Sequence, residues 1–289
     1  MLHAAAHMTV ECIVLDFDGT FTLVDREATP FIEGFLSDLR ALVGPAVADR
    51  WDDTVRRVKS DPDRYGWEND GKIVAPSHAD PYILATTVAQ LLLAEAGITS
   101  RAERTEKLQT LYQRNYPRAL TIFRPDAKAV IETLLATSLP IFVVTNSRTE
   151  HVEAKLDQLA PQGRSRIVVR GDARKFVLTE PDVVDDAWQR IPETRELPGL
   201  SRPIHLHRGA YYEQLRRIWR DTGTDAAGTL VCGDIFELDL ALPAALGARI
   251  HLVARPDTPE YERRAARASV GGSASQELGG LLEVLELPG

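Results

Sequence analysis

Three short apolar segments, each followed at once by polar residues, constrain the fold of this chain more than any other feature. They are Cys12 to Leu15, Leu139 to Val144 and Thr229 to Cys232, and each contains β-branched side chains. Continuous apolar character over so few residues predicts strands buried on both faces, as in a parallel sheet covered by helices. Two weaker segments, Arg166 to Val169 and Arg249 to Val253, show the same pattern.

Helical patterns separate these predicted strands. They occupy residues 127–136, 149–159, 210–221 and 237–246, where apolar side chains recur at helical spacing. Alternation of strand and helix favours a sheet with helices on both faces, joined by right-handed crossovers. The sequence therefore predicts a doubly wound α/β domain with a mostly parallel sheet.

The segment from residue 24 to residue 120 interrupts this alternation. It contains four helical patterns and no convincing strand, and its polar stretch at residues 61–81 is expected to be a loop. We therefore predict an all-helical domain at 24–120, inserted into an α/β core formed by residues 8–23 and 121–289. The four predicted helices are at 31–43, 47–59, 82–96 and 101–116.

Composition excludes several classes of protein. The 289 residues are 44% hydrophobic and 26% charged, which is typical of globular chains. The 34 Lys and Arg against 42 Asp and Glu give a net charge of −8, which argues against general binding of nucleic acid or anionic membranes. No apolar stretch is long enough to span a membrane, and residues 1–8 lack the pattern of a secretory signal. We expect a cytoplasmic protein, monomeric or a small homo-oligomer, with Cys12 and Cys232 reduced in the core.

Four carboxylates follow the predicted strands. Asp16 and Asp18 come directly after the first strand, and Asp234 and Asp239 follow the strand at residues 229–232. The carboxyl ends of parallel strands meet at one edge of the sheet, where ligands bind. Clustered carboxylates repel one another, so a hard cation such as Mg²⁺ is expected among them. With a cation bound, an aspartate can attack phosphorus and form a covalent intermediate.

Three motifs in this sequence resemble those of the haloacid dehalogenase-like superfamily. Asp16-Phe17-Asp18-Gly19-Thr20 is similar to its first motif, in the form that its phosphatases and phosphomutases use. Thr145-Asn146-Ser147 is similar to its second motif, and the segment from Gly233 to Asp239 to its fourth, with two acidic residues separated by a short turn. The motifs occur in the family order between residues 12 and 253. Residues 24–120 then occupy the position of the family's helical cap.

The resemblance implies a Mg²⁺-dependent phosphohydrolase that acts on a small phosphorylated metabolite. Asp16 would be the nucleophile, and Asp18 would protonate the leaving oxygen and later activate water. The carboxylates of Asp16 and Asp234 and the backbone carbonyl of Asp18 would bind Mg²⁺, with Asp239 supporting the site. Because the family's dehalogenases lack a carboxylate at the position of Asp18, its presence favours phosphoryl transfer.

The third motif of the family supplies a Lys or Arg for the phosphoryl group, and here two residues compete. Arg208 opens the helical pattern at 210–221, where the family places this cation, and we prefer it. Lys175 is the rival, but it lies far from the fourth-motif strand unless residues 171–203, a predicted loop elaboration, fold back. The residues expected to contact the phosphoryl group are therefore Gly19, Thr145, Asn146 and Arg208.

Two other functions remain open at this point. A phosphomutase of the same superfamily would use the same residues and return the phosphoryl group to a bound sugar phosphate. A non-catalytic phosphate-binding protein could retain the fold without turnover. Mg²⁺-dependent turnover would separate an enzyme from a binding protein, and neither nucleic acid nor membrane is an expected partner.

Overall fold

The computed structural model describes residues 9–287, which form two compact units. The core unit contains residues 9–21, 124–199 and 203–287, and the inserted unit contains residues 22–123 together with 200–202. The predictions about residues 1–8, including the start of the core at residue 8, lie outside the described residues. Among those that are described, no helix combines the length and apolar character that crossing a membrane requires.

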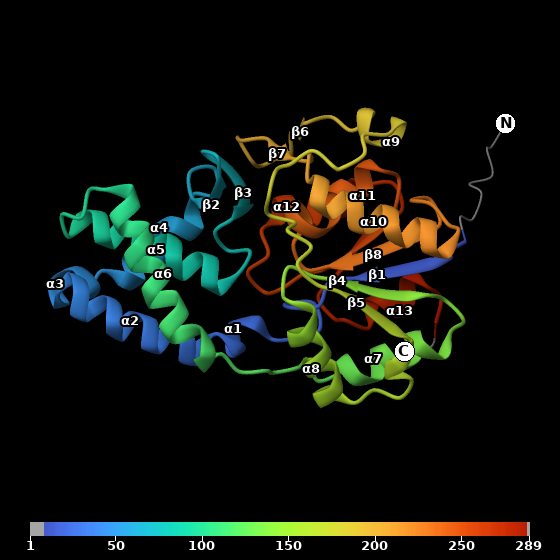
Figure 1. The fold of residues 1–289 in the computed structure, drawn as a ribbon, viewed down its shortest axis with the longest axis horizontal. Helices are drawn as coiled ribbons and strands as arrows, with labels where there is room; N and C mark the ends of the chain where they lie inside the picture. The colour runs from blue at the N-terminus through green and yellow to red at the C-terminus, as the bar shows by residue number, and fades with distance from the viewer. Residues whose placement is uncertain (1–8, 288–289) are drawn as a thin grey trace. The chain divides into compact units, whose positions relative to one another are not determined.

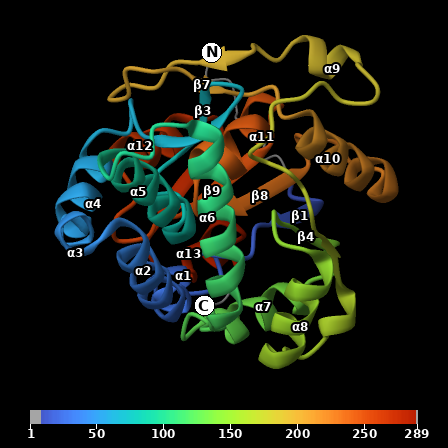
Figure 2. The ribbon, with the colours of Figure 1, turned by 60° about the vertical axis from the view of Figure 1, so that its left-hand side comes forward.

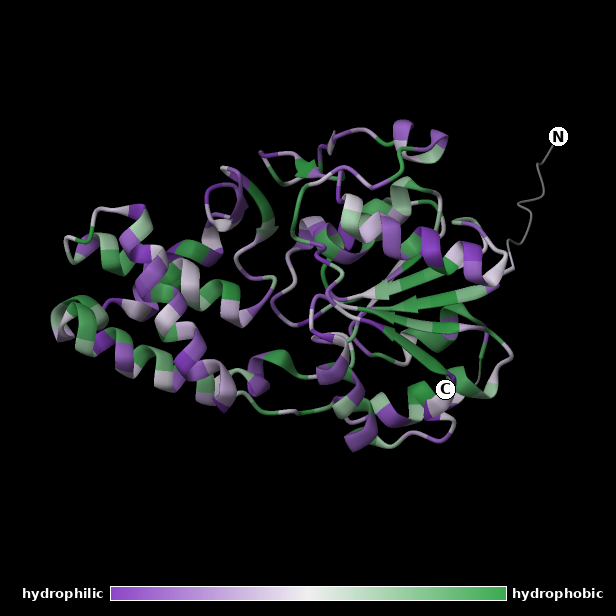
Figure 3. Ribbon diagram, in the orientation of Figure 1, coloured by the Kyte–Doolittle hydropathy of each residue, from purple (hydrophilic) through white to green (hydrophobic). Residues whose placement is uncertain are grey.

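The core unit is built around a six-stranded sheet in which all neighbouring strands are parallel (Figure 1). In spatial order its strands are β10 (Gly272–Ser275), β9 (Arg249–Val253), β8 (Thr229–Gly233), β1 (Cys12–Leu15), β4 (Ile141–Val144) and β5 (Ile167–Arg170). The chain extends the sheet from β1 toward β5 and then returns to extend it in the other direction. The strands are the hydrophobic centre of this unit (Figure 3), because helices cover both of their faces.

The direction of each crossover decides which face a helix covers. The helices are α7 (Ala127–Ala136), α8 (Thr149–Leu159), α10 (Gly209–Thr222), α11 (Ala241–Ala245), α12 (Glu260–Ala268) and α13 (Gly280–Val284), with a short 3₁₀ turn at Arg164–Arg166. Right-handed connections place α7 and α8 with α13 on one face and α10, α11 and α12 on the other (Figures 1 and 2). This arrangement confirms the predicted doubly wound α/β core.

Strand register aligns the ends of β1, β4 and β8. Leu15, the last residue of β1, pairs with Val143 on one side and Cys232 on the other. The backbone N–H of Asp16 then donates to the Cys232 carbonyl oxygen at 2.8 Å. Because the strands end together, the polar residues that follow them are brought to one edge of the sheet.

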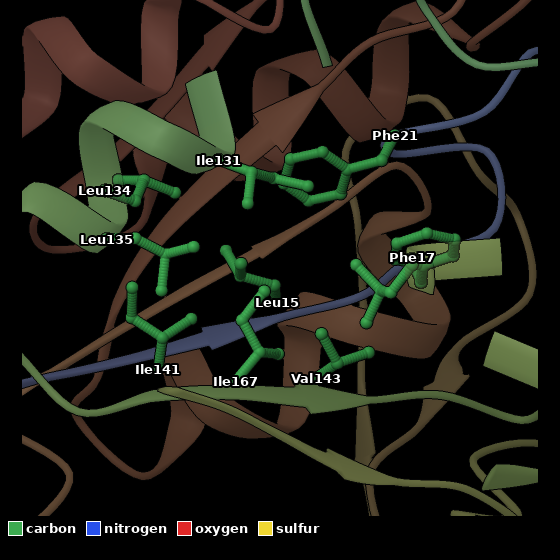
Figure 4. Close-up of a pocket in the computed structure, with 10 residues that line it drawn as sticks. Leu15, Phe17, Phe21, Ile131, Leu134, Leu135, Ile141, Val143 and Ile167 are labelled. Carbon is green, nitrogen blue, oxygen red and sulfur yellow. The ribbon is translucent and has the colours of Figure 1, made fainter. Parts of the chain in front are cut away.

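Phe17 anchors the segment between the first two aspartates. Its side chain is fully buried and stacks on Phe21, with the ring centroids 5.9 Å apart. Figure 4 shows Phe17 among apolar side chains from β1, β4, β5 and α7, which leave no space for water. Successive residues of an extended chain point to opposite sides, so burying Phe17 directs its two neighbours away from this core. The other side chains here include Leu15, Phe21, Ile131, Val143 and Ile167.

The inserted unit is mainly helical, but the prediction that it is all helical is wrong. Strands β2 (Gly66–Asn69) and β3 (Lys72–Pro76) form an antiparallel hairpin inside the stretch expected to be a loop. Asp70 and Gly71 connect them with φ angles of 50° and 75°, and Asp-Gly is a favoured pair for such a turn. The helices are α1 (Val24–Glu27), α2 (Thr29–Val43), α3 (Pro45–Ala48), α4 (Trp51–Ser60), α5 (Pro81–Glu95) and α6 (Arg101–Asn115), followed by a 3₁₀ turn at Tyr116–Arg118.

Burial of one apolar face stabilises these helices. Phe31 and Phe35 of α2, Val88 and Leu92 of α5 and Leu108 of α6 belong to one hydrophobic cluster. Helix α5 begins at a side-chain cap, because the Asp80 carboxylate accepts hydrogen bonds from the N–H groups of the two residues after Pro81. The inserted unit therefore has a core of its own.

The segment at 171–203 is more ordered than a loop elaboration. It contains α9 (Asp186–Gln189) and β6 (Thr194–Arg195), and β6 pairs with β7 (Ile204–His205). Trp188 is buried, donates from Nε1 to the Glu180 carboxylate at 2.7 Å and packs on Tyr212. These contacts hold the segment against α10, which bears on the position of Lys175.

Candidate active site

Three carboxylates meet at the carboxyl edge of the sheet. One oxygen atom from each of Asp16, Asp234 and Asp239 lies within 4.8 Å of the others, and all three residues are buried. Asp16 follows β1 and Asp234 follows β8. Asp239 lies in a π-helical turn, Phe236–Leu240, that starts two residues after Asp234. Thr20 donates to both Asp16 and Asp234 at 3.4 Å, so the first motif is joined directly to the fourth.

Lys175 is the cation beside Asp16. Its Nζ donates to Asp16 Oδ1 at 2.7 Å and to Asp239 Oδ1 at 2.8 Å, and its side chain is 1% exposed. The preference for Arg208 over Lys175 is therefore corrected. The separation of Lys175 from β8 along the sequence is no obstacle, because the segment at 171–203 leaves the sheet edge after Lys175 and returns at α10.

Backbone hydrogen bonds carry Lys175 to this position. After β5 the chain continues beside the residues that follow β4: the N–H of Ala173 donates to Thr145 O, and that of Lys175 to Asn146 Oδ1. Asp172 and Arg174 both have a φ of 50°, which is costly for residues other than glycine. The strained path turns the Lys175 side chain into the acidic group.

Arg208 lies behind Lys175 and holds its backbone. Its guanidinium donates to the carbonyl oxygens of Lys175 and His205 and lies 4.0 Å from the Glu237 carboxylate. Tyr211, on the first turn of α10, donates to the Asp239 carbonyl oxygen at 2.8 Å, and its ring lies 5.3 Å from the Lys175 ammonium. The start of α10 thus supports Lys175 and the turn that carries Asp239.

The second-motif residues lie at the end of β4, beside the acidic group. Thr145 is buried, and its hydroxyl oxygen accepts a hydrogen bond from the N–H of Ser147 at 3.1 Å. Asn146 uses its side-chain oxygen to hold the backbone of Lys175 at 2.7 Å. Contact of Thr145, Asn146 and Gly19 with a phosphoryl group stays a prediction.

Asp18 is held apart from the acidic group by different partners. Lys155 Nζ, from α8, donates to Asp18 Oδ1 at 2.7 Å, and the Ser147 hydroxyl donates to Asp18 Oδ2 at 2.7 Å. The carboxylate that is proposed to move protons is therefore separate from those suited to bind a cation. The expected metal ligand at this residue is its backbone carbonyl, and that stays a prediction.

Burial disfavours the charged forms of Asp16 and Asp234. It raises the pKa of Asp16 well above its ordinary value, against the opposing charge of Lys175, and raises the pKa of Asp234 to about 8, although Arg255 opposes that shift. For Lys175, burial lowers the pKa, but the charges of Asp16 and Asp239 outweigh this and leave the pKa above its ordinary value. Lys175 is therefore charged at neutral pH, and a further cation would favour ionisation of the carboxyl groups.

The chemistry of the site fits a hard divalent cation. Lys175 donates to the Oδ1 atoms of Asp16 and Asp239, whereas Asp16 Oδ2 and Asp234 Oδ1 accept only the long hydrogen bonds from Thr20 at 3.4 Å among the bonds described above. Asp234 Oδ2 is buried and has no hydrogen-bond donor among residues 9–287, although an Arg255 nitrogen lies 3.4 Å away. Carboxylate oxygens are the ligands that Mg²⁺ prefers. Asp16 and Asp234 are the residues that would hold it, with Asp239 beside them.

Gly19 gives the first motif room to approach Asp234. Its φ is 85°, and a Cβ atom at this position would lie 2.3 Å from Asp234 Oδ2. We expect Gly19→Ala to lower the melting temperature by several degrees and to weaken Mg²⁺ binding, because backbone strain of about 1–2 kcal/mol is added to a clash with a carboxylate. Gly223→Ala is the matched control, with a φ of 73° and nothing within 4 Å of its added Cβ. Equal losses of melting temperature in the two variants, by calorimetry, would contradict this.

Four residues of the site are missing from the sequence-based list: Lys155, Lys175 as the preferred cation, Tyr211 and Arg255. The sequence carries a signal only for Lys175, which lies five residues after the end of β5. Lys155, Tyr211 and Arg255 reach the site through packing of helices and loops on the sheet, and no local pattern marks them.

No protein-family model matches the sequence, and no curated protein matches it. Among solved structures, YfnB of Bacillus subtilis, described as a HAD-hydrolase bound to magnesium, has a TM-score of 0.53 at 14% identity, over 96% of this chain and 99% of that one. A protein of Haemophilus somnus, described as a predicted phosphoglycolate phosphatase, has a TM-score of 0.53 at 13% identity, over 95% and 97%. A haloacid dehalogenase-like protein of Bacteroides fragilis has a TM-score of 0.50 at 14% identity, over 94% and 100%.

These structures align with this chain over nearly its whole length, although few residues are identical. The chain has the fold of the haloacid dehalogenase-like hydrolases.

Proposed function

We propose that this protein is a Mg²⁺-dependent phosphohydrolase that cleaves small phosphate monoesters through a phosphorylated Asp16. The arrangement of Asp16 is the observation that carries the proposal. Asp16 is buried at the carboxyl edge of the sheet and accepts a hydrogen bond from the ammonium of Lys175. Two further carboxylates lie beside it, and together they suit a divalent cation. A second carboxylate, Asp18, lies two residues away with partners of its own.

The first half of the reaction breaks the ester. An Asp16 oxygen attacks phosphorus, the bond from phosphorus to the leaving oxygen breaks, and Asp18 donates a proton to that oxygen. Lys175 stabilises the negative charge that develops on the phosphoryl oxygens, and a fixed cation in a dry site is effective in this role. Bound Mg²⁺ would neutralise charge on the carboxylates and the phosphoryl group together.

The second half releases phosphate. Asp18, now ionised, accepts a proton from water as the water oxygen attacks phosphorus, and the bond from Asp16 to phosphorus breaks. Inorganic phosphate leaves, and both aspartates return to their starting states. We assign selection of the leaving group to the inserted unit, which would act as a cap and exclude water while the intermediate exists.

Metal dependence tests this proposal. We expect hydrolysis of p-nitrophenyl phosphate with Mg²⁺, loss of activity after treatment with EDTA, and recovery when Mg²⁺ is added back. Mg²⁺ should also raise the melting temperature without substrate, and by more at pH 8 than at pH 6, because it competes with protons on Asp16 and Asp234, whose pKa values are raised. Activity that is indifferent to EDTA, or a Mg²⁺ effect that shrinks as the pH rises, would contradict the assignment.

A further inference from the structure

Both oxygen atoms of the Asp18 carboxylate are occupied by side chains from one neighbouring region. Lys155 Nζ is 2.7 Å from Oδ1, and Ser147 Oγ is 2.7 Å from Oδ2. The side chains of Lys155 and Asp18 are 21% and 25% exposed, so the pair is shielded without being sealed from solvent. One hydrogen bond to each oxygen atom fixes the plane of the Asp18 carboxylate as well as its position.

These two partners come from a rigid support. Ser147 follows β4, and its N–H donates to the Thr145 hydroxyl oxygen at 3.1 Å. Lys155 lies within α8, whose Val152 and Leu156 are fully buried in the core. The first residue of α8, Thr149, accepts a hydrogen bond from the N–H of Gly171 at 2.9 Å, which ties the helix to the end of β5. Motion of Lys155 and Ser147 relative to the sheet is therefore restricted.

We infer that Lys155, together with Ser147, is a positioning residue that aims Asp18 at the leaving oxygen of the substrate. The inference rests on the proposed function. An aspartate side chain at the surface of a loop turns freely about two bonds, whereas proton transfer requires hydrogen-bond reach of one particular oxygen. A partly exposed ion pair contributes little to folding, so the main effect of this pair is on catalysis.

The inference predicts an effect that depends on the leaving group. p-Nitrophenolate is a stable anion and leaves without much help from an acid, whereas phenolate needs protonation more. The two esters are nearly the same size, so the inserted unit should treat p-nitrophenyl phosphate and phenyl phosphate alike. We expect Lys155→Met to lower kcat/KM for phenyl phosphate about 10-fold more than kcat/KM for p-nitrophenyl phosphate, because kcat/KM reports the half-reaction in which the leaving group departs and positioned acids contribute factors of about 10² to 10⁴.

Three further variants sharpen the test. Lys155→Arg retains a cation and should recover most of the loss on phenyl phosphate. Ser147→Ala should shift the ratio of the two kcat/KM values in the same direction as Lys155→Met. Lys128→Met removes an exposed lysine of α7 and should leave the ratio unchanged. Thermal unfolding of each variant identifies any general loss of structure.

The outcomes separate the inference from the function on which it rests. An active wild type whose Lys155→Met variant loses the same factor of kcat/KM on both esters, or loses nothing, overturns the inference and leaves the proposed function standing. A wild type that hydrolyses neither ester with Mg²⁺ overturns the proposed function, and the inference with it. A larger loss on phenyl phosphate with recovery in Lys155→Arg supports both.

Discussion

We expect the Asp16→Asn variant to fold normally and to have no measurable Mg²⁺-dependent phosphatase activity. The amide has nearly the same shape as the carboxylate but is a poor nucleophile, so we expect kcat to fall by a factor on the order of 10⁴ or more, the scale seen when a covalent nucleophile is removed. The expected result is measured as turnover of p-nitrophenyl phosphate with saturating Mg²⁺. It differs from the loss of a binding residue, which would raise KM and spare kcat.

Stability should change little in this variant. Burial already disfavours the charged form of Asp16, and Lys175 keeps a carboxylate partner in Asp239 when Asp16 becomes neutral. Thermal unfolding of the metal-free variant should therefore lie close to that of the wild type, while the stabilisation by Mg²⁺ is reduced. Asp182→Asn, at an exposed position of the core unit, is the control and should keep full activity. Full activity in Asp16→Asn would contradict the assignment of Asp16 as the nucleophile.

Local sequence patterns predict most of the fold and part of the candidate site. The apolar runs at β1, β4 and β8 predict buried parallel strands from composition alone, and the aspartates at their ends follow from the rule that strand ends share an edge. Asp16 and Asp234 are brought together for this reason. The boundaries of α7 and α8 match the prediction because an amphipathic pattern there agrees with the packing of the helices on the sheet.

The missed elements have weak or misleading local patterns. β10 consists of Gly, Ser and Ala, residues with little preference for strands, and it forms because it pairs along β9. The hairpin of β2 and β3 carries polar residues on its first strand, so that only Asp70 and Gly71 indicated a turn. Local sequence does not reveal that a strand forms through its neighbours.

The misplaced cation has a different cause. Sequence spacing favoured Arg208 because it lies near β8 along the chain, but the described structure places Lys175 beside Asp16 through hydrogen bonds to the residues after β4. The segment of some 30 residues between Lys175 and Arg208 leaves the sheet edge and returns to it. Distance along the chain is a poor guide to contact wherever such a segment intervenes.

Replacement of Lys175 should therefore have a large effect on both activity and stability. We expect Lys175→Met to lower kcat for p-nitrophenyl phosphate by about 10²- to 10³-fold, the loss that follows removal of one charge-stabilising donor. It also leaves two buried carboxylates, Asp16 and Asp239, without their shared cation, and breaking a buried ion pair costs about 3–5 kcal/mol when the remaining charge stays ionised. Activity must therefore be measured well below the melting temperature of the variant.

The pH dependence of that destabilisation has a definite sign. Without Lys175 the pKa of Asp16, already raised, rises further, so the folded variant binds more protons than the unfolded chain does. Its stability relative to the wild type therefore falls as the pH increases from 6 to 8, and Mg²⁺ should restore part of it by replacing the missing charge. Urea titrations at both pH values, with and without Mg²⁺, measure this.

Arg208→Lys provides the matched comparison, because the structure gives Arg208 a supporting position. Its guanidinium donates to the backbone of Lys175 and His205, so a lysine there weakens support but leaves the cation beside Asp16 in place. We expect this variant to be less stable and to keep kcat within about 10-fold of the wild type, since its effect reaches Asp16 only through the Lys175 backbone. An active Lys175→Met together with an inactive, folded Arg208→Lys would restore Arg208 as the phosphate-stabilising cation and show that the position of Lys175 beside Asp16 is incidental to the chemistry.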